Sequence, residues 1–332
     1  MSAAAGPGSG GGAPDAEAGV GRDYLTYPHR SYGMDHDLYD WSPITERPKV
    51  LWPGGKGVAL WVLVALEWFR FDADGKPFRV AGSPTKEYPD FRDWTWRDYG
   101  NRIGIYRVAD VLERHGVRAT AAVNSDLVRK RRSTVDEAKR RGWELIAHGT
   151  SSSVVHHVGM SEDVERSIIA EALTVVGEAN GAPVRGWLSP GQSESRLTPE
   201  ILAERGVEYL CDWPNDDVPV PFRTPGGPIW SLPASNELSD VHVLLSLHQT
   251  APSWADQVVA AYDVLEQDAA RHGQGRVLCL QVHPWLMGQP HRSRHFERAI
   301  AAVTGRDSCW SATGAEILDA YRAATGGRHP SL

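Results

Sequence analysis

The sequence predicts a single-domain α/β barrel with a parallel sheet, and three observations lead to this fold class. Strand-like and helix-like segments alternate along the chain in about seven β/α units, which is typical of a parallel sheet. No linker-like segment divides this alternation into two domains. The GxGxxG and Walker patterns that favour an open nucleotide-binding sheet are absent. We therefore expect residues 22–332 to form one barrel domain.

Residues 1–21 are expected to form a disordered tail. They are rich in Gly and Ala and contain no aromatic residue, so they cannot bury enough apolar surface to offset the entropy lost on ordering. The tail lacks the basic and apolar regions of a secretory signal, and no apolar run in the chain reaches about 18 residues. We expect neither secretion nor a membrane span.

Charge and cysteine usage restrict the partners and the compartment. The net charge of −7 offers no footprint for nucleic acid, and the basic cluster Arg129–Arg132 is typical of a solvated loop. Cys211, Cys279 and Cys309 are odd in number and lack CxxC spacing, which argues against a disulfide framework or a zinc knot. We expect a cytoplasmic protein with a small-molecule substrate, and no nucleic-acid or membrane partner.

The predicted strands are short apolar runs. Residues 58–66 are all apolar and lie between Gly57 and Glu67, which indicates a strand that is buried on both faces. The other predicted strands are residues 117–123, 143–147, 184–188, 209–211, 229–232 and 276–282.

The predicted helices begin and end at capping signals. Ser161 precedes two acidic residues, and Thr198 precedes Pro199, both of which favour a helix start. Gly116 and Gly206 favour a helix end. The predicted helices are residues 101–115, 133–141, 161–179, 198–205, 253–272, 292–303 and 313–324. Residues 70–98 and 213–228 are predicted to be loops.

Polar residues follow the predicted strands. Because the carboxyl ends of the strands of a β/α barrel form its active-site face, we expect these residues to converge. Acids, histidines and an amide at one rim are the groups that acid/base hydrolysis requires. The residues are Glu67, Asn124, His148, Ser189, Asp212, Ser235, Asn236, Glu237 and His283.

The same part of the chain carries a family resemblance. The motifs are Trp-Pro-Gly-Gly (52–55), Arg-Asp-Tyr-Gly-Asn-Arg (97–102), Gly-Trp-Glu-Leu-Ile-Ala-His-Gly (142–149), Arg-Gly-Trp-Leu (185–188), Asp-Trp-Pro-Asn-Asp-Asp (212–217) and Val-His-Pro-Trp-Leu-Met-Gly-Gln-Pro-His-Arg (282–292). In this order they resemble the polysaccharide deacetylase (NodB-homology) superfamily, and within it the branch of PuuE-type allantoinases and related cyclic-amide hydrolases. The resemblance implies a distorted (β/α)₇ barrel and a homo-oligomer, either a dimer or a tetramer.

The chain departs from the metal-dependent members of this superfamily. Those members place two acids after the first strand and two histidines four residues apart after the third. Here Trp68 follows Glu67, and Ser152 stands four residues after His148. Indole donates only through its N–H and cannot replace a carboxylate ligand. We therefore expect no metal, with zinc held through His156 and His157 as the alternative.

The favoured hypothesis is metal-independent hydrolysis of the C–N bond of a cyclic amide or ureide. Glu67, desolvated by neighbouring aromatic residues, is expected to have a raised pKa and to act as the base. His148 and His283 are expected to donate hydrogen bonds, and His283 to protonate the leaving nitrogen. Asp212 is the predicted orienting partner of His283.

Flat apolar walls and a few polar anchors suit a small planar ring. The predicted substrate-binding residues are Trp68, Asn101, Arg102, Trp187, Ser189, Trp213, Asn215, Asp216, Asn236, Glu237 and Trp285.

Two other functions remain open on the sequence. One is a metal-dependent deacetylase or deformylase of a small N-acyl or sugar substrate. The other is a barrel that binds a ligand without catalysis, because an inactive relative can retain Glu67, His148 and His283. Taken singly, each of these three residues also fits a structural role in a core.

Overall fold

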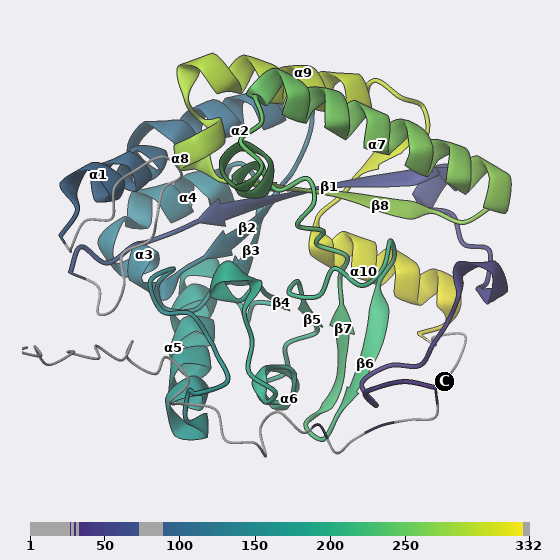
Figure 1. Ribbon diagram of the computed structural model, residues 1–332, viewed down its shortest axis with the longest axis horizontal. Coiled ribbons are helices and arrows are strands. Elements are labelled where there is room, and N and C mark those ends of the chain that lie inside the picture. Colours follow the sequence, from purple (N-terminus) through teal and green to yellow (C-terminus); the bar gives the residue numbers. More distant parts are fainter. Residues whose placement is uncertain (1–26, 28–29, 31–32, 73–88, 328–332) are drawn as a thin grey trace, which may run out of the picture.

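The computed structural model describes residues 27, 30, 33–72 and 89–327. The predicted disordered tail and part of the predicted loop 70–98 lie outside these residues. Within them, nine strands form one sheet that curls into a half-barrel (Figure 1), which confirms the predicted fold class. The strands are β1 (Val58–Leu66), β2 (Thr120–Val123), β3 (Glu144–Ala147), β4 (Gly186–Trp187), β5 (Tyr209–Leu210), β6 (Val220–Thr224), β7 (Gly227–Ser231), β8 (Arg276–Val282) and β9 (Cys309–Ser311).

The strand order in the sheet is β6-β7-β5-β4-β3-β2-β1-β8, and β9 pairs with the start of β1. Every pairing is parallel except that of β6 with β7. The carboxyl ends of the parallel strands therefore meet at one edge, as the location of the site requires.

Helices cover the outer face of the sheet. In Figure 1, α7 and α9 lie over the β1–β8 side, whereas α5 and α6 lie at the β4–β5 side. The helices of eight or more residues are α1 (Phe91–Tyr99), α2 (Ile105–Arg114), α4 (Arg132–Arg140), α5 (Glu162–Asn180), α7 (Ala251–His272), α9 (Pro290–Thr304) and α10 (Gly314–Thr325). The shorter helices are α3 (Ser125–Lys130), α6 (Thr198–Glu204) and α8 (Pro284–Met287).

Strand β1 is buried on both faces, as its apolar run predicted, and its alternate residues serve two cores. Val58, Leu60, Val62, Val64 and Leu66 belong to the outer core beneath the helices. The intervening residues Ala59, Trp61 and Leu63 belong to an inner core together with Ile317 and Leu318 of α10. Because side chains alternate across a strand, the next inward positions are Ala65 and Glu67, and these line an open cleft. Helix α10 thus fills the lower half of the barrel and leaves the upper half for a site.

Two predicted loops contain regular structure. The described end of the 70–98 segment contains α1, whose N-cap Asp90 accepts hydrogen bonds from the backbone N–H groups of Arg92 and Asp93. The 213–228 segment contains β6, which was not predicted because the Pro and Gly residues of this segment favour a loop. The sequence also did not predict α3, α8 or β9. The predicted β1 and β8 are confirmed with the same bounds.

The sheet edge at β8 is joined to the opposite side of the half-barrel by single hydrogen bonds. The backbone N–H of Val277 donates to the carbonyl of Asp217 at 2.9 Å. The side-chain amide of Gln281 donates to the carbonyls of Ala234 and Ser235 at 3.2 and 3.3 Å. No strand pairing joins β8 to β6 or β7 within the described residues, so this side of the half-barrel is distorted and open.

Two glycines allow α8 to approach the π-helical turn η3 (Gly100–Gly104), which lies between α1 and α2. A Cβ at Gly100 would lie 2.5 Å from the backbone nitrogen of Trp285, and one at Gly104 would lie 2.1 Å from the carbonyl oxygen of Pro284. Only glycine fits at such separations.

We expect Gly104→Ala to destabilise the protein by about 1–3 kcal/mol, because the added methyl group must displace the α8 backbone. Thermal unfolding measures this loss as a lowered Tm. Gly177→Ala in α5 is the matched control, since its Cβ has 3.6 Å to the nearest heavy atom and Ala favours a helix. Equal melting temperatures for the two variants would show that the α8 contact does not need glycine.

Candidate active site

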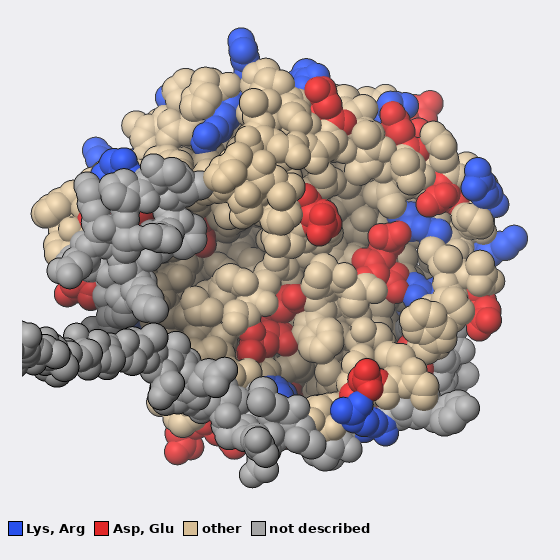
Figure 2. Space-filling view, in the orientation of Figure 1, with Lys and Arg blue, Asp and Glu red and all other residues tan. Residues whose placement is uncertain are grey.

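The carboxyl ends of the strands surround a cleft of about 330 Å³. Figure 2 shows that this face of the molecule is hollowed near its centre, with acidic side chains exposed in the hollow. The cleft is lined by Ala65, Glu67, Phe69, Arg97, His148, Ser152, Val155, Leu188, Ser189, Gly191, Gln192, Asn236, Ser239, Val241, Gln281, His283 and Trp285.

Glu67 lies between the two predicted histidines. Its Oε1 is 3.8 Å from Nε2 of His148, and its Oε2 is 4.0 Å from Nε2 of His283. Oε2 also accepts a hydrogen bond from the indole N–H of Trp285 at 3.0 Å. The side-chain amide of Asn101 donates to the Glu67 carbonyl at 2.8 Å and fixes the backbone here. The predicted convergence of Glu67, His148 and His283 is present.

The Glu67 carboxylate is stabilised in its charged form. Burial raises its pKa, but the charges of His283, His148 and Arg97 outweigh burial and lower the pKa to about 2. The predicted raised pKa of Glu67 is therefore wrong. The sequence showed the apolar neighbours of Glu67 but not the cations that lie opposite it.

His283 is held by Asp240, a residue that the sequence analysis did not single out. Nδ1 of His283 is 2.6 Å from Oδ1 of Asp240, and the backbone N–H of His283 donates to Oδ2 at 2.8 Å. The Asp240 side chain is fully buried. Burial lowers the pKa of His283, but the charges of Asp240 and Glu67 outweigh it, and the pKa is raised above 6.5. His283 is thus set up to carry a proton beside Glu67.

Asp212 does not contact His283, and its predicted role as the orienting partner is wrong. It acts instead on the Leu188–Ser189 peptide: the backbone N–H of Ser189 donates to Asp212 Oδ1 at 2.7 Å, and the carbonyl of Leu188 is 2.7 Å from Nδ1 of His148. This peptide unit joins Asp212 to His148 through two hydrogen bonds. The carbonyl accepts from a proton on Nδ1, so Nε2 is the ring nitrogen that faces Glu67.

Asp212 is also one of a pair of buried acids. Burial raises its pKa, and burial together with the Asp212 charge raises the pKa of Glu194 well above its usual range. The indole N–H of Trp213 donates to Glu194 Oε2 at 2.7 Å. We infer that the two carboxyl groups share a proton, because two charged carboxylates would repel each other at this depth.

The residues that stand where metal-dependent relatives place ligands do not fit a metal. The Trp68 ring lies 6.0 Å from that of Trp94, and the Ser152 hydroxyl donates to Asn124 Oδ1 at 3.0 Å. The alternative ligands do not line the cleft: His156 is buried against Glu165, and His157 is exposed. In the part of the chain that the structure describes, no three His, Cys, Asp or Glu side chains gather as a ligand set.

Three of the predicted substrate-binding residues line the cleft, namely Ser189, Asn236 and Trp285. The other eight do not line it, and each has a different environment. Arg102 and Glu237 are exposed, whereas Trp187 is fully buried and donates to the Ser189 hydroxyl. Asp216 pairs with Arg47 at 2.6 Å, and Asn215 accepts from Ser231 at 3.2 Å. Trp68, Asn101 and Trp213 make the contacts described above.

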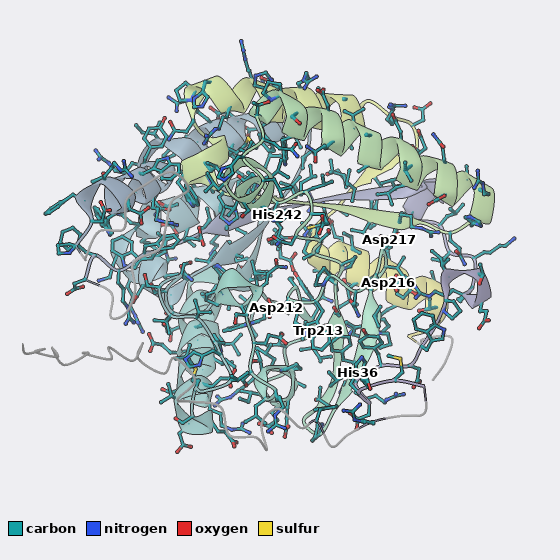
Figure 3. All side chains as sticks on the ribbon, in the orientation of Figure 1. His36, Asp212, Trp213, Asp216, Asp217 and His242 are labelled. Atoms are coloured by element: carbon teal, nitrogen blue, oxygen red, sulfur yellow. The ribbon has the colours of Figure 1, made fainter. Side chains whose placement is uncertain are left out.

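Figure 3 shows why the 212–217 motif does not act as one unit. Asp212 lies near the middle of the molecule, whereas Asp216 and Asp217 lie apart from it toward β6 and β8. Asp216 is bonded to Arg47, and Asp217 is 3.7 Å from the Arg276 guanidinium. The predicted substrate contacts of Asn215 and Asp216 do not agree with this placement.

Five polar lining residues were not predicted as site residues, namely Arg97, Ser152, Gln192, Ser239 and Gln281. Arg97 is buried over the rings of Phe69 and Trp285, with its guanidinium carbon 3.9 and 4.8 Å from their centroids. Gln281 stands two residues before His283 in β8, so period-two alternation could have placed it on the same face. Arg97 opens the 97–102 motif, which could have indicated it, whereas the sequence holds no such signal for Gln192.

We expect Asp240→Asn to lower the pKa of His283, because the charge that raises it is removed while burial persists. A nuclear magnetic resonance titration of the imidazole measures this change. Asp212→Asn is the control and leaves the His283 pKa unchanged, since Asp212 does not contribute to it. A shift in the control but not in Asp240→Asn would contradict the assignment of Asp240.

None of the helices in the described residues is long and apolar enough to cross a membrane.

Residues 97–210 match the family model described as polysaccharide deacetylase. A curated relative from Schizosaccharomyces pombe, named "Putative polysaccharide deacetylase", is 23% identical over 255 residues, which is 70% of this chain and 76% of the relative.

Solved structures show the same fold. A probable polysaccharide deacetylase from Pseudomonas aeruginosa PAO1 is 19% identical with a TM-score of 0.76, covering 91% of this chain and 100% of that one. A PuuE allantoinase is 20% identical with a TM-score of 0.76, covering 90% of this chain and 98% of that one. The resemblance in the sequence motifs is confirmed as a similarity: residues 97–210 match the polysaccharide deacetylase model, and the chain shares its fold with both solved structures.

Proposed function

We propose that this protein is a hydrolase that opens the C–N bond of a small cyclic amide or ureide without a metal. The observation that carries the proposal is the placement of Glu67 between His148 and the His283–Asp240 pair, at the end of a cleft whose residues do not fit a metal triad. The family match supports hydrolytic chemistry, and the fold shared with a PuuE allantoinase is consistent with a ring substrate.

In the proposed reaction, a water molecule between Glu67 Oε1 and His148 Nε2 attacks the substrate carbonyl carbon. The separation of 3.8 Å between these two atoms is too long for a direct hydrogen bond and suits a bridging water. Glu67 takes one proton from the water as its oxygen forms the new bond to carbon. His283 then donates its proton to the ring nitrogen as the C–N bond breaks.

The low pKa of Glu67 is compatible with this role because the two groups titrate together. Protonated His283 is the main charge that lowers the pKa of Glu67. When His283 gives its proton to the leaving nitrogen, that charge disappears and the pKa of Glu67 rises, so Glu67 retains the proton that it took from the water until the C–N bond has broken. Arg97, which also lowers the pKa of Glu67, keeps its charge and balances the developing negative charge.

We expect Glu67→Gln to reduce turnover about 10²–10⁴-fold, because the amide retains the shape but cannot accept a proton. Steady-state rates on the true substrate measure this loss, with thermal unfolding as the check on folding. Glu237→Gln, at an exposed residue outside the cleft lining, is the control and retains the wild-type rate. Rates of Glu67→Gln near those of the wild type would rule out Glu67 as the base.

We expect kcat/KM to fall as the pH rises through the raised pKa of His283, because His283 must hold a proton to serve as the acid. With a pKa of about 2, Glu67 remains ionised at neutral and mildly acidic pH, so its titration does not change kcat/KM in that range. In Asp240→Asn the alkaline limb moves to lower pH. A rate that instead increases with pH would indicate neutral His283 acting as a base.

The substrate class is tested with chelator-treated protein and mass spectrometry. The panel contains allantoin, hydantoins, dihydropyrimidines, succinimide-type imides, and N-acetyl and N-formyl amines. Addition of one water to a ring compound supports the proposal. Loss of an acyl group would favour a deacylase, and zinc-dependent activity would overturn the metal-free mechanism. If no compound of the panel reacts, with or without added zinc, a barrel that only binds its ligand would be favoured.

The compartment and the assembly state remain predictions. All three cysteines are free thiols, consistent with a reducing cytoplasm. The homo-oligomeric state, dimer or tetramer, is expected from the resemblance alone, and light scattering of the full chain tests it.

A further inference from the structure

Two glutamine side chains face the cleft with their amide groups fixed in the same way. The amide nitrogen of Gln192 donates to the carbonyls of Cys211 and Ala234, both at 3.1 Å. The amide nitrogen of Gln281 donates to the same Ala234 carbonyl at 3.2 Å and to that of Ser235 at 3.3 Å. Both glutamines line the cleft.

These contacts determine which end of each amide is free. A carbonyl oxygen only accepts hydrogen bonds, so the –NH₂ group of each glutamine must point at the backbone, where both of its hydrogens are used. No described residue donates a hydrogen bond to Oε1 of Gln192 or of Gln281. Since both amides donate to the Ala234 carbonyl, the two amide groups lie at the same wall of the cleft.

The backbone at Gln192 supports a functional reason for this arrangement. Its φ is +52°, in the left-handed region that non-glycine residues seldom adopt. Within the described ranges, His248 is the only other non-glycine residue with positive φ. The strained conformation is held by a hydrogen bond from the Gln192 N–H to the Ser189 carbonyl and by the two amide bonds. Strain of this kind gathers at ligand sites.

We infer that Gln192 and Gln281 form an acceptor pair that binds N–H groups of the substrate ring, and so selects cyclic amides and ureides with unsubstituted nitrogens. The inference rests on the proposed function for the reaction that follows binding. A fixed acceptor loses little entropy when a donor arrives, and a ring that cannot donate leaves it without a partner. The pair also carries no charge, as suits a neutral ring.

The test compares binding of hydantoin with its methyl derivatives. 1-Methylhydantoin and 3-methylhydantoin each lack one N–H group, whereas 5-methylhydantoin keeps both and adds the same volume at carbon. Calorimetric titration uses the Glu67→Gln protein, so that turnover does not interfere. We expect hydantoin and 5-methylhydantoin to bind at least about tenfold more tightly than one or both of the N-methylated rings.

Substitution of the glutamines then tests whether Gln192 and Gln281 cause this preference for rings with free N–H groups. We expect Gln192→Met and Gln281→Met, each on the Glu67→Gln background, to reduce the preference for N–H rings toward unity. Gln274→Met is the matched control: its amide is fixed by the carbonyls of Ile44 and Arg47 in the same manner, but it lies outside the cleft lining and leaves the preference intact. Thermal unfolding shows that each variant is folded.

Several outcomes would overturn the inference. They are equal binding of all four rings, an unchanged preference in folded Gln192→Met and Gln281→Met, and no binding of hydantoin to the folded Glu67→Gln protein. Tighter binding of N-acetylglucosamine than of hydantoin would also overturn the assignment to ring amides.

The test separates this inference from the proposed hydrolysis. Ring opening by the wild-type protein is measured in parallel. N–H-selective binding without ring opening would support the acceptor pair and contradict the proposed hydrolysis. Ring opening with equal binding of methylated and unmethylated rings would support the proposed hydrolysis and contradict the acceptor pair.

Discussion

The buried carboxylate of Glu67 is the constraint on which the site depends. A charged carboxylate in a largely apolar environment requires compensating charge and hydrogen bonds. His283, His148 and Arg97 supply the positive potential, and the Trp285 indole supplies a hydrogen bond. Three of these groups are themselves positioned by other elements. Asp240 holds His283, the Leu188–Ser189 peptide holds His148, and the glycines of η3 allow α8 to bring Trp285 close.

The side-chain amide of Asn124 joins the backbone segments that follow β1 and β3. Asn124 follows β2 and is fully buried. Its Oδ1 accepts a hydrogen bond from the Trp68 N–H at 2.7 Å, and its side-chain nitrogen donates to the His148 carbonyl. The backbones on either side of Glu67 and His148 are thereby tied together. Asn124 thus supports Glu67 and His148 although it does not itself line the cleft.

The sequence predicted the main parts of the site because they follow from strand periodicity. Glu67, His148 and His283 each stand directly after an apolar run and were expected at one rim. Asp240 was missed because it lies in a short helical segment beyond β7, where no pattern shows that it reaches the end of β8. The predicted role of Asp212 was wrong for a related reason. Its position after a strand placed it at the same rim as His283, but that position does not specify which side chains form hydrogen bonds. The predicted anchors at 215–216 failed because β6 folds back and draws them toward Arg47.

The sequence by itself determined the parallel half-barrel and the inward positions of its strands, because an alternation of period two is a local property. In β1 that alternation leads from Trp61 in the lower core to Glu67 in the cleft, and in β8 it leads from Cys279 to His283. Only the tertiary structure decided the protonation of these groups. The pKa of Glu67 is lowered rather than raised because its charge is balanced by residues far away in the sequence. Such long-range electrostatic contacts leave no periodic trace in the chain, and they appear only when the strand ends have come together.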